Sequence, residues 1–571
     1  MIIIDRNTIA EYLSDYLPKF SQQEIKDLIE IPPQDLNYSY AFPCFQLAKV
    51  KKKSPHLIAK ELEEQLELPE YLEAIEANGP YLNFKIKPQL PLEQIFTLKE
   101  KYGRIYEEIG IDQKKSSRIV IEYPAPNTNK PLHFGHIRNM LLGRSLSRCL
   151  KYKGEIVFDV NLNNDRGIHI CKSMYAYKNW GNNKEPDVKS DHFVGKFYVK
   201  YNEMEKKDNK IIEEVYDLLR LWEENDAETR ELWKKMNFWA FEGFKETYKS
   251  LKISFDKEYF ESDIYWKGKE KVLKGLERGI FNKTDDGAII AHLKEKFNLP
   301  DKILMRKDGT SLYVTQDIYL AYQKKEDFDY DKSIYVVANE QDLYFKQLFT
   351  VLDMIGFKED KFHLSYGMVY LPEGKMKSRE GIIVDADNII EKMHSLAYKE
   401  VNKRYPKLSE NLKKERAAAI GMAALTFFIL KYNPKSEFVF NPKESISFEG
   451  ETGPYIQYCY ARIASIISKS KNVIDLNVNW DLIDHEKELT LVKHLNYFPE
   501  ILNSVRKNYT IHQIPQYLLT LCQAFNSFYS SCQVLSSDDE LEKARLLLIK
   551  CVQIVIRIGL QILGIDILEQ M

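Results

Sequence analysis

The stretch IVIEYPAPNTNKPLHFGHIRNMLLGR, residues 119–144, decides the fold of this chain. Its apolar start, residues 119–121, is typical of a buried strand, and the Pro- and Asn-rich segment that follows predicts a loop. Apolar residues then return at helical spacing, at Ile137, Met140 and Leu141. Gly154 stands where such a helix is expected to end, so strand, loop and helix follow one another.

A second apolar run, residues 156–162, predicts the next strand and completes a βαβ unit. His133 and His136 then lie in the first turn of the helix, where unpaired backbone N–H groups attract anions. Two histidines three residues apart are a weak motif by themselves. Their place between a strand and a helix favours a nucleotide phosphate site. A metal site is not favoured, because no other Cys, Asp or His is clustered beside them in the sequence.

The composition places the chain among soluble, multidomain proteins. At 571 residues and 67.2 kDa it is too long for one core, and 44% apolar with 29% charged residues is ordinary for a folded enzyme. The formal net charge of -2 gives no overall nucleic-acid footprint, although a local basic patch could still bind RNA. The seven cysteines are scattered without a C-x-x-C pair, so we expect neither a disulfide framework nor a structural zinc site.

Neither end of the sequence indicates a membrane segment. The start, MIIIDRNTIAEYL, has only a short apolar run before Asp5 and is not expected to be a secretory signal. Residues 544–563 form the most apolar long stretch, but Arg545, Lys550 and Arg557 interrupt it. We therefore expect a buried helix, no membrane contact and a cytoplasmic protein.

Changes of pattern along the chain indicate a multidomain α/β protein with three domains. Residues 1–108 mix helical spacing with a strand at 79–86 and predict an N-terminal α+β domain. Residues 109–445 alternate strands and helices around a helical insertion at about 179–300, which predicts an interrupted, doubly wound parallel sheet of the Rossmann type. Residues 446–571 are helical throughout and predict an all-α bundle.

The segment KILMRKDGTSLYVTQDI, residues 302–318, predicts a β-hairpin that turns at Asp308 and Gly309. It places Tyr313 and Asp317 beyond the turn, at the entry to a helix. The alternation of strands and helices then resumes, with strands expected at 334–338 and 363–371 and a helix at 342–356.

Two motifs of this chain resemble those of a known enzyme class. HFGH at 133–136 and KMKSREG at 375–381 resemble the HIGH and KMSKS motifs of class I aminoacyl-tRNA synthetases. The segments EYPAPNTNKPLHFGHIRN, YVTQDI, EQDLYFKQLF and GPYIQYCYARI, in this order, resemble arginyl-tRNA synthetases over essentially the whole chain. The resemblance implies an N-terminal tRNA-contacting domain, a Rossmann-type catalytic domain and a helical anticodon-binding domain.

The resemblance also implies a reaction. L-Arginine and ATP would give arginyl-adenylate, and arginine would then pass to the 3′ end of tRNA(Arg). We expect Mg²⁺ to bind with ATP rather than as a resident protein metal, and the enzyme to act as a monomer. Proofreading is not expected, because a guanidinium is distinctive enough for selection in one step. The family often needs bound tRNA for the first step, which we carry over as a hypothesis.

Other functions remain open at this point. One is a noncatalytic tRNA-binding paralogue that keeps the fold, although intact His133, His136 and Lys375 argue against it. Another is a class I synthetase for cysteine, which would need a zinc site that the scattered cysteines do not provide. Nucleotidylyltransferases share the HxGH motif but lack the C-terminal bundle.

The phosphates of ATP are expected to be held from two sides. His133 and His136 would donate hydrogen bonds on one side, and Lys375 would approach from the other. The usual second lysine of the second motif is replaced by Ser378, so Lys130, just before HFGH, is expected to supply a charge; the alternative is a solvated loop lysine. Gly135 leaves room for the nucleotide base. The resemblance implies ATP contacts from Pro126, His133, Gly135, His136, Lys375, Met376, Ser378 and Arg379.

Recognition of arginine calls for carboxylates, because a guanidinium offers five fixed donors. Glu122 and Asp317 match the positions that the family uses for this purpose. Tyr313 would lie against the guanidinium, and Asn127 and Gln341 would contact the polar atoms of the amino acid. Without the resemblance, each of these residues would have an ordinary structural role. A further departure is Arg166, which stands where the familiar family pattern has tryptophan.

Aromatic and basic residues are candidates for RNA contacts. In the helical region, Tyr455, Tyr458 and Arg462 could stack on unpaired anticodon bases, although their helical spacing is equally compatible with a core position. In the N-terminal domain the resemblance implies tRNA contacts from a strand segment that contains Tyr81, Asn83 and Phe84.

Overall fold

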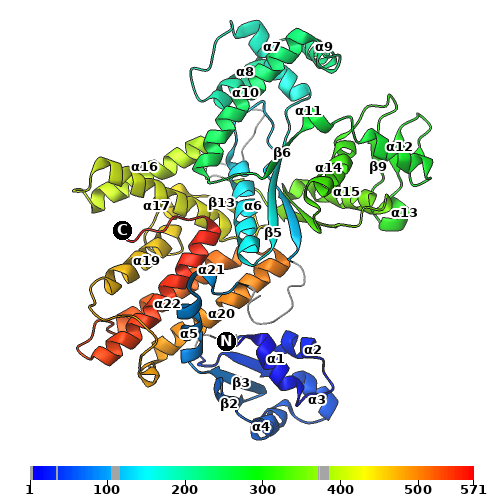
Figure 1. Ribbon diagram of the computed structural model, residues 1–571. Coiled ribbons are helices and arrows are strands. Elements are labelled where there is room, and N and C mark those ends of the chain that lie inside the picture. Colours follow the sequence, from blue (N-terminus) through cyan, green and yellow to red (C-terminus); the bar gives the residue numbers. More distant parts are fainter. Residues whose placement is uncertain (1–3, 34–35, 105–115, 371, 373–384) are drawn as a thin grey trace. The chain divides into compact units, whose positions relative to one another are not determined.

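The computed structural model describes residues 4–33, 36–104, 116–370, 372 and 385–571, and it divides into two compact units (Figure 1). One unit gathers the two ends of the chain, from Met1–Asp112, Phe448–Asn508 and Gln513–Met571. The other unit is formed by Gln113–Ser447 with Tyr509–His512. The N-terminal domain and the C-terminal bundle therefore belong to one compact unit, whereas the sequence patterns separated them.

The second unit is built on a five-stranded parallel sheet, with the strand order β11-β10-β4-β5-β6. Its strands are β4 (Arg118–Glu122), β5 (Ile156–Asn163), β6 (Lys257–Phe260), β10 (Lys332–Ala338) and β11 (Asp360–Tyr366). The strand order reverses between β4 and β10. In a doubly wound sheet this reversal opens a crevice at the carboxyl ends of the two strands. The loops after β4 and β10 carry the sequence candidates Asn127, His133 and Gln341.

Helices cover both faces of this sheet. The crossover from β4 to β5 is α6 (Phe134–Tyr152), which ends just before Gly154 as the sequence predicts. The helices α14 (Tyr313–Phe328) and α15 (Asp342–Met354) lie on the other face of the sheet from α6 (Figure 1). They lead toward β10 and β11, on the opposite side of β4 from β5, and right-handed crossovers in that direction place helices on this second face. Burial is complete at Val120 on β4 and Ile318 on α14, so the sheet has the apolar core that a parallel sheet requires.

The expected single insertion at 179–300 is wrong in one respect, because β6 within it pairs with β5 and belongs to the main sheet. Before β6 stands a helical group with its own aromatic core. After β6 stands a small antiparallel sheet of order β7-β8-β9 with short helices. The helices before β6 are α7 (Ile168–Trp180), α8 (Ser190–Glu205), α9 (Ile211–Glu223) and α10 (Ala227–Ser250). The later elements are α11 (Glu261–Ile264), α12 (Lys269–Glu277), β7 (Asn282–Lys283), β8 (Ile289–Ala291), α13 (Lys294–Phe297) and β9 (Lys302–Met305).

The predicted hairpin at 302–318 is also wrong in its second half. Its turn is present, with Gly309 at a φ of 77°. Beyond it only one bridge, between Met305 and Ser311, joins the two sides, and β9 pairs with β8 instead. The chain enters α14 at Tyr313, where the hydroxyl of Thr315 accepts a hydrogen bond from the Leu312 N–H at 3.0 Å and caps the helix.

Beyond β11 the second unit continues with a two-stranded pair and three helices. They are β12 (Val369–Tyr370), α16 (Ala386–Arg404), α17 (Glu410–Leu430), β13 (Phe438–Val439) and α18 (Pro442–Ser445). Arg138 on α6 joins this part to the sheet, because its buried guanidinium donates to the carbonyls of Gly367 (2.5 Å), Pro434 (2.8 Å) and Ser436 (2.9 Å). Sequence reasoning did not anticipate this structural role of Arg138.

The first unit begins with the expected α+β domain, an antiparallel sheet of order β1-β3-β2 with four helices. Its elements are α1 (Arg6–Ser14), α2 (Gln22–Leu28), β1 (Tyr40–Pro43), α3 (Phe45–Lys51), α4 (Pro55–Gln65), β2 (Leu72–Asn78) and β3 (Tyr81–Ile86). The helix α5 (Gln89–Leu98) follows and packs against the C-terminal helices.

The C-terminal part is the expected helical bundle. Its helices are α19 (Gly453–Ile467), α20 (Glu486–Asn508), α21 (Gln513–Ser531) and α22 (Asp539–Leu563). By length and composition, α22 could cross a membrane, but 83% of its most apolar window is buried inside the unit. It is the core helix of the bundle, as the charges in its sequence predict.

A group of polar residues joins the N-terminal domain to α20, and we call Arg6, Tyr40, Lys493, Tyr497 and Glu500 the polar seam. The Glu500 carboxylate accepts from the Tyr40 hydroxyl at 2.6 Å and pairs with Arg6 Nε at 3.0 Å. The Tyr497 hydroxyl donates to the Ser39 carbonyl at 2.5 Å. Aromatic packing accompanies these contacts, since the rings of Tyr40 and Tyr497 meet with their centroids 6.0 Å apart.

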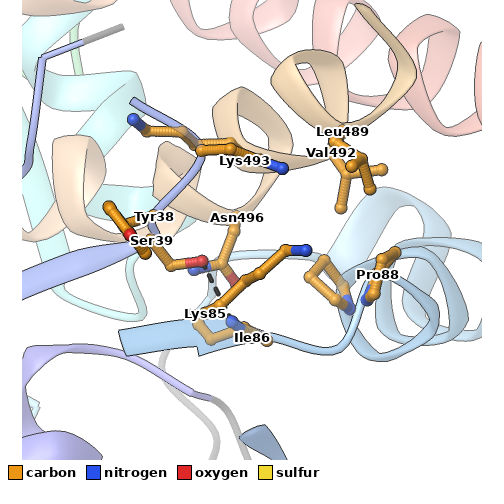
Figure 2. A pocket seen from close by; sticks show the side chains of 11 residues that line it. Tyr38, Ser39, Lys85, Ile86, Pro88, Leu489, Val492, Lys493 and Asn496 are labelled. Carbon is orange, nitrogen blue, oxygen red and sulfur yellow. Dashed lines mark hydrogen bonds between the residues drawn. The ribbon is translucent and has the colours of Figure 1, made fainter. Parts of the chain in front are cut away.

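Within the polar seam, Lys493 is held by main-chain carbonyls. Its ammonium donates to the carbonyls of Pro32 (3.3 Å), Pro33 (3.0 Å) and Leu36 (2.9 Å). Figure 2 shows the small pocket beside it, where the Ser39 hydroxyl accepts a hydrogen bond from the Ile86 N–H at 3.2 Å.

Candidate active site

The loop after β4 is fixed to β5 by an irregular continuation of the sheet. The Ala125 N–H donates to Asn161 Oδ1 at 3.1 Å, and the Asn164 N–H donates to the Pro126 carbonyl at 2.9 Å. Pro126 is buried by these contacts, whereas the Asn127 side chain is exposed at the carboxyl edge of the sheet. The loop thus leaves the Asn127 amide directed to solvent, where a ligand can reach it.

His133 and His136 form one stacked pair at the start of α6. Their ring centroids are 3.8 Å apart, and the His133 N–H donates to His136 Nδ1 at 3.0 Å. Because Nδ1 of His136 accepts, the neutral ring carries its proton on Nε2, which is a hydrogen-bond donor. Burial, with His133 and Lys130 adding to it, holds the pKa of His136 well below its usual range. Burial and Lys130 lower the pKa of His133 to about 3. Both rings are therefore neutral at physiological pH.

Gly135 is required by the ring beside it. A Cβ at this position would lie 3.0 Å from Cε1 and 3.1 Å from Nδ1 of His133. The sequence suggested that Gly135 leaves room for a nucleotide base, and the structure adds that it leaves room for the first histidine.

Lys130 stands next to the histidine pair. Burial lowers the pKa of its ammonium, and it lines a pocket of about 460 Å³ together with His192 and Asp385. It is therefore placed near His133 and His136, as its proposed phosphate role requires. The partners expected on the other side of ATP, Lys375, Met376, Ser378 and Arg379, lie outside the described residues.

Asp317 lies one turn into α14, beyond the exposed side chain of Tyr313. The Tyr344 hydroxyl donates to its Oδ2. Burial, with the negative charge of Glu122 as a further cause, raises the pKa of Asp317 to about 7. The influence of Glu122 on Asp317 shows that the fold brings the two predicted carboxylates close together. Tyr313, with 65% of its surface exposed, stands at the rim rather than in the core.

Glu122 has a buried partner that sequence reasoning missed. Lys324 Nζ lies 2.9 Å from Glu122 Oε2, and the Lys324 side chain has no exposed surface. Lys324 follows Asp317 by seven residues on α14, so both project from the same face of the helix. The sequence holds one signal of this partner, because Lys324 is a lysine in the apolar stripe of a buried helix.

Glu261 and Arg166 form the adjoining wall, and only Arg166 was noted from the sequence. The Arg166 guanidinium lies 3.8 Å above the Tyr265 ring and pairs with Glu223 at 2.7 Å. It therefore packs as a flat group on an aromatic ring. Burial raises the pKa of Glu261 to about 7. The Asp165 carboxylate accepts from the N–H and hydroxyl of Ser262, at 2.9 and 2.7 Å, which holds the wall in place.

Gln341 ends the short 3-10 helix Asn339–Gln341 that follows β10, and it is exposed. Since β4 and β10 are neighbouring parallel strands, Gln341 lies at the same edge of the sheet as Asn127.

The RNA candidates of the bundle form a connected group on its surface. The Arg462 guanidinium donates to the Tyr458 hydroxyl and to Asn526 Oδ1, both at 3.0 Å. The Asn526 amide in turn donates to the Tyr455 hydroxyl at 2.6 Å. Tyr458, Arg462 and Tyr529 line a pocket of about 540 Å³. These residues are partly exposed, so their helical spacing does not make them core residues.

The RNA candidates of the N-terminal domain differ from one another. Tyr81 is partly exposed and packs edge-on against Phe45, whose ring centroid is 5.8 Å away. Asn83 and Phe84 are only 3% and 0% exposed, and the Asn83 amide donates to the Glu76 carbonyl at 3.3 Å. Contacts of Asn83 and Phe84 with tRNA stay a prediction, and the structure shows that both side chains pack inside the domain.

Among the described residues, one group has ligand atoms close enough for a metal, namely Asp191, His192 and Asp387. The Lys189 ammonium already occupies the space between the carboxylates, 2.7 Å from Asp387 and 3.3 Å from Asp191. The group is thus a set of ion pairs around a lysine.

Comparison with known proteins adds three family models that follow one another along the chain. The model described as the N-terminal domain of arginyl-tRNA synthetase matches residues 6–86. The model described as the class I (R) tRNA synthetase catalytic domain matches residues 103–442, and the model of the DALR anticodon-binding domain matches residues 456–571.

Relatives and solved structures agree with these matches. The arginine--tRNA ligase of Treponema denticola is 42% identical over 99% of this chain and 98% of its own length, and that of Borrelia turicatae is 40% identical over 96% and 95%. The arginyl-tRNA synthetase of Thermus thermophilus superimposes with a TM-score of 0.84 over the full length of both chains at 26% identity. The Plasmodium falciparum structure, at 20% identity and a TM-score of 0.81, shows likeness of fold.

Proposed function

The chain belongs to the arginyl-tRNA synthetases of class I, and from this premise we propose which of its residues carry out the reaction. It is an arginine–tRNA ligase, which activates arginine with ATP and transfers it to tRNA. A cysteine enzyme or a noncatalytic paralogue finds no support among the relatives, which are named for arginine.

The observation that carries the site assignment is that buried Glu122 and partly buried Asp317 lie close enough for the charge of Glu122 to act on Asp317. Without a ligand, the charge of Glu122 helps to keep Asp317 protonated up to about pH 7. A guanidinium cation between the two would restore the ionised form and donate hydrogen bonds to both carboxylates. We therefore assign Glu122 and Asp317 to the substrate guanidinium. Tyr313 would cover it, and Asn127 and Gln341 would contact the amino and carboxyl groups of arginine.

Activation of arginine needs no protein nucleophile, because the substrate carboxylate attacks the α-phosphorus of ATP and pyrophosphate leaves. The protein has to hold two anions together and stabilise the charge that develops. His136 supports this role through its Nε2–H donor, and His133 and Lys130 lie beside it. Lys375, Met376, Ser378 and Arg379 would act from the other side of ATP, with Pro126 and Gly135 beside the nucleotide. Mg²⁺ would accompany ATP on its phosphates.

For tRNA(Arg), the surface group of Tyr455, Tyr458 and Arg462 offers aromatic faces and a cation for unpaired bases. In the N-terminal domain the candidates are Tyr81, Asn83 and Phe84, of which Tyr81 is partly exposed. We propose residues 1–108, 109–445 and 446–571 as the tRNA-contacting, catalytic and anticodon-binding domains. We also propose a cytoplasmic monomer without membrane contact, which the burial of α22 supports.

Substitution of Asp317 tests the assignment of the arginine site. Asp317→Ala should abolish charging with arginine while ATP binding persists, because the change removes a guanidinium acceptor only. Glu326→Ala, an exposed acidic residue on the same helix, is the matched control and should charge normally. An unchanged arginine KM in Asp317→Ala would contradict the assignment.

The order of events can be tested separately. We expect ATP–pyrophosphate exchange to depend on bound tRNA, as it does in many members of the family. Equal exchange rates with and without tRNA would exclude that dependence and leave the residue assignments unaffected.

A further inference from the structure

Lys324 is a charged residue without solvent contact, held by partners from two strands. Its ammonium donates to Glu122 Oε2 on β4 at 2.9 Å and to the Ser333 hydroxyl on β10 at 3.2 Å. It also lies 4.0 Å from the centroid of the Tyr335 ring. Ser333 and Tyr335 are themselves buried, at 0% and 4% exposure. The position of the ammonium is therefore fixed by partners on both β4 and β10.

A buried lysine is costly for stability, and an apolar residue of similar size often serves the fold better. Its retention next to Glu122 thus calls for a role beyond joining α14 to the sheet. Glu122 has two carboxylate oxygens, and Lys324 engages one of them. The other oxygen remains for a second cation, at the place where Asp317 supplies a further acceptor.

The charges around Glu122 and Asp317 favour the binding of one singly charged cation. Glu122 and Asp317 would bring two negative charges into a buried space, which carboxylates avoid by protonation. Lys324 compensates one of them from within the protein. The nearest other cation is Lys302, which is partly exposed and therefore screened by solvent. Tyr344, Tyr335, Tyr330 and Tyr259 also lie near the pair, and all four are neutral phenols at physiological pH. Glu261 and Tyr313 interact with Asp317 as well.

We propose that Lys324 is a positioning residue for arginine recognition: it holds Oε2 of Glu122 and so turns the other carboxylate oxygen toward the substrate guanidinium. The inference rests on the proposed function, in which Glu122 and Asp317 bind that group. Lys324 itself does not touch arginine. It acts on the substrate through Glu122, and its loss should weaken the binding of arginine without affecting the binding of ATP.

Lys324→Met keeps the length of the side chain and removes its charge. We expect the KM for arginine in aminoacylation to rise about 10- to 100-fold, the range of one charged hydrogen bond, with the KM for ATP unchanged. The acidic limb of kcat/KM for arginine should move to higher pH, because the two carboxylates then share less positive charge. Lys325→Met, the next residue on α14 with its ion pairs to Asp329 and Glu359, is the control and should leave both KM values unchanged.

Lys324→Gln gives a second measurement, because it keeps a hydrogen-bond donor and is less disruptive to packing. A purely structural lysine would lower the melting temperature and leave the arginine KM and the pH limb unmoved, which would overturn the proposal. Failure of both variants to fold would overturn it as well, since it would place Lys324 in the fold. Glu122→Gln separates the two levels of inference. If it leaves the arginine KM unchanged, the site assignment fails, and if it alone raises KM, only the role of Lys324 fails.

Discussion

Lys493 and Lys324 are both buried lysines, and they are held by different kinds of partner. Lys493 of the polar seam is 7% exposed and donates to three main-chain carbonyls of the N-terminal domain. Lys324 of the catalytic unit is fully buried and donates to the side-chain carboxylate of Glu122. Lys493 fixes the path of the main chain, and Lys324 fixes the orientation of the Glu122 carboxylate.

The difference separates two uses of buried charge. A cation on carbonyls stabilises an arrangement of segments, so its removal should be seen in unfolding. A cation on a carboxylate in a ligand site tunes an acceptor, so its removal should be seen in substrate binding. Variants in the two regions should therefore separate stability from catalysis, and the predictions below test that separation.

The largest effect is expected in the catalytic unit. His136→Ala removes a preorganised Nε2–H donor from the phosphate site, and the rate of adenylate formation should fall about 10²- to 10³-fold. The melting temperature should fall only modestly, because the change removes one cap hydrogen bond, from the His133 N–H to His136 Nδ1, worth about 1 kcal/mol. His292→Ala, an exposed histidine paired with Asp301, is the control and should retain the rate. Pre-steady-state pyrophosphate release measures the effect, and a rate within threefold of the original would refute the phosphate role.

The next effect belongs to the polar seam. Glu500→Ala leaves Arg6 and the Tyr40 hydroxyl without their acceptor, so the free energy of unfolding should fall by about 2–3 kcal/mol. The KM for arginine should not change. Glu500→Gln retains an acceptor and should lose less. Denaturant titration followed by a probe in the first unit gives the loss, and an unshifted midpoint would remove the distinction between the two regions.

Local patterns were sufficient for the scaffold of the site but not for its partners. The strand, loop and helix of 119–144 were predicted because each rests on neighbours in sequence, and α6 does end before Gly154. The hairpin failed because Thr315 caps a helix where alternation suggested a strand. The parallel sheet and the helical bundle are confirmed by the structure.

Residues that act across the fold were harder to predict. Glu122 and Lys324 are 202 residues apart in the chain, and periodicity shows that Lys324 faces inward without showing what it meets. Glu261 and Arg138 were missed for the same reason. The resemblance to the family supplied Glu122 and Asp317 as a pair, since spacing alone gave each an ordinary role. Phe84 was likewise assigned from the family, and the structure adds that its side chain is fully buried, which the sequence pattern did not show.

The pH dependence of arginine use follows from Asp317. Its pKa of about 7 in the free protein means that the acceptor is neutral below that pH, so kcat/KM for arginine should fall about tenfold per unit there and level off above it. Its contribution to stability runs the other way, fully present below the ordinary pKa of 3.8 and lost as pH rises through about 7. His133, with a pKa of about 3, does not contribute to this limb.

Glu261, whose pKa is also raised to about 7, could give the same fall in kcat/KM at low pH. The pH profile of the residual activity of Asp317→Asn shows which of the two residues governs this acidic limb. If Asp317 governs the limb, the variant should show none between pH 6 and 8. A limb that persists would assign the pH dependence to Glu261 and leave Asp317 with a structural hydrogen bond.

The smallest effect compares the hydroxyls of partly buried Tyr344 and buried Tyr330, and it repeats the contrast of the lysines. Tyr344 donates to the Asp317 carboxylate and stabilises its ionised form, so Tyr344→Phe should move the acidic limb to higher pH by up to about one unit. Tyr330 donates to the main-chain carbonyl of Ala321 at 3.1 Å, so Tyr330→Phe should lower the melting temperature and leave the limb in place. Equal shifts in both variants would mean that packing of α14, rather than the acceptor to which a donor is bonded, sets the charge of Asp317.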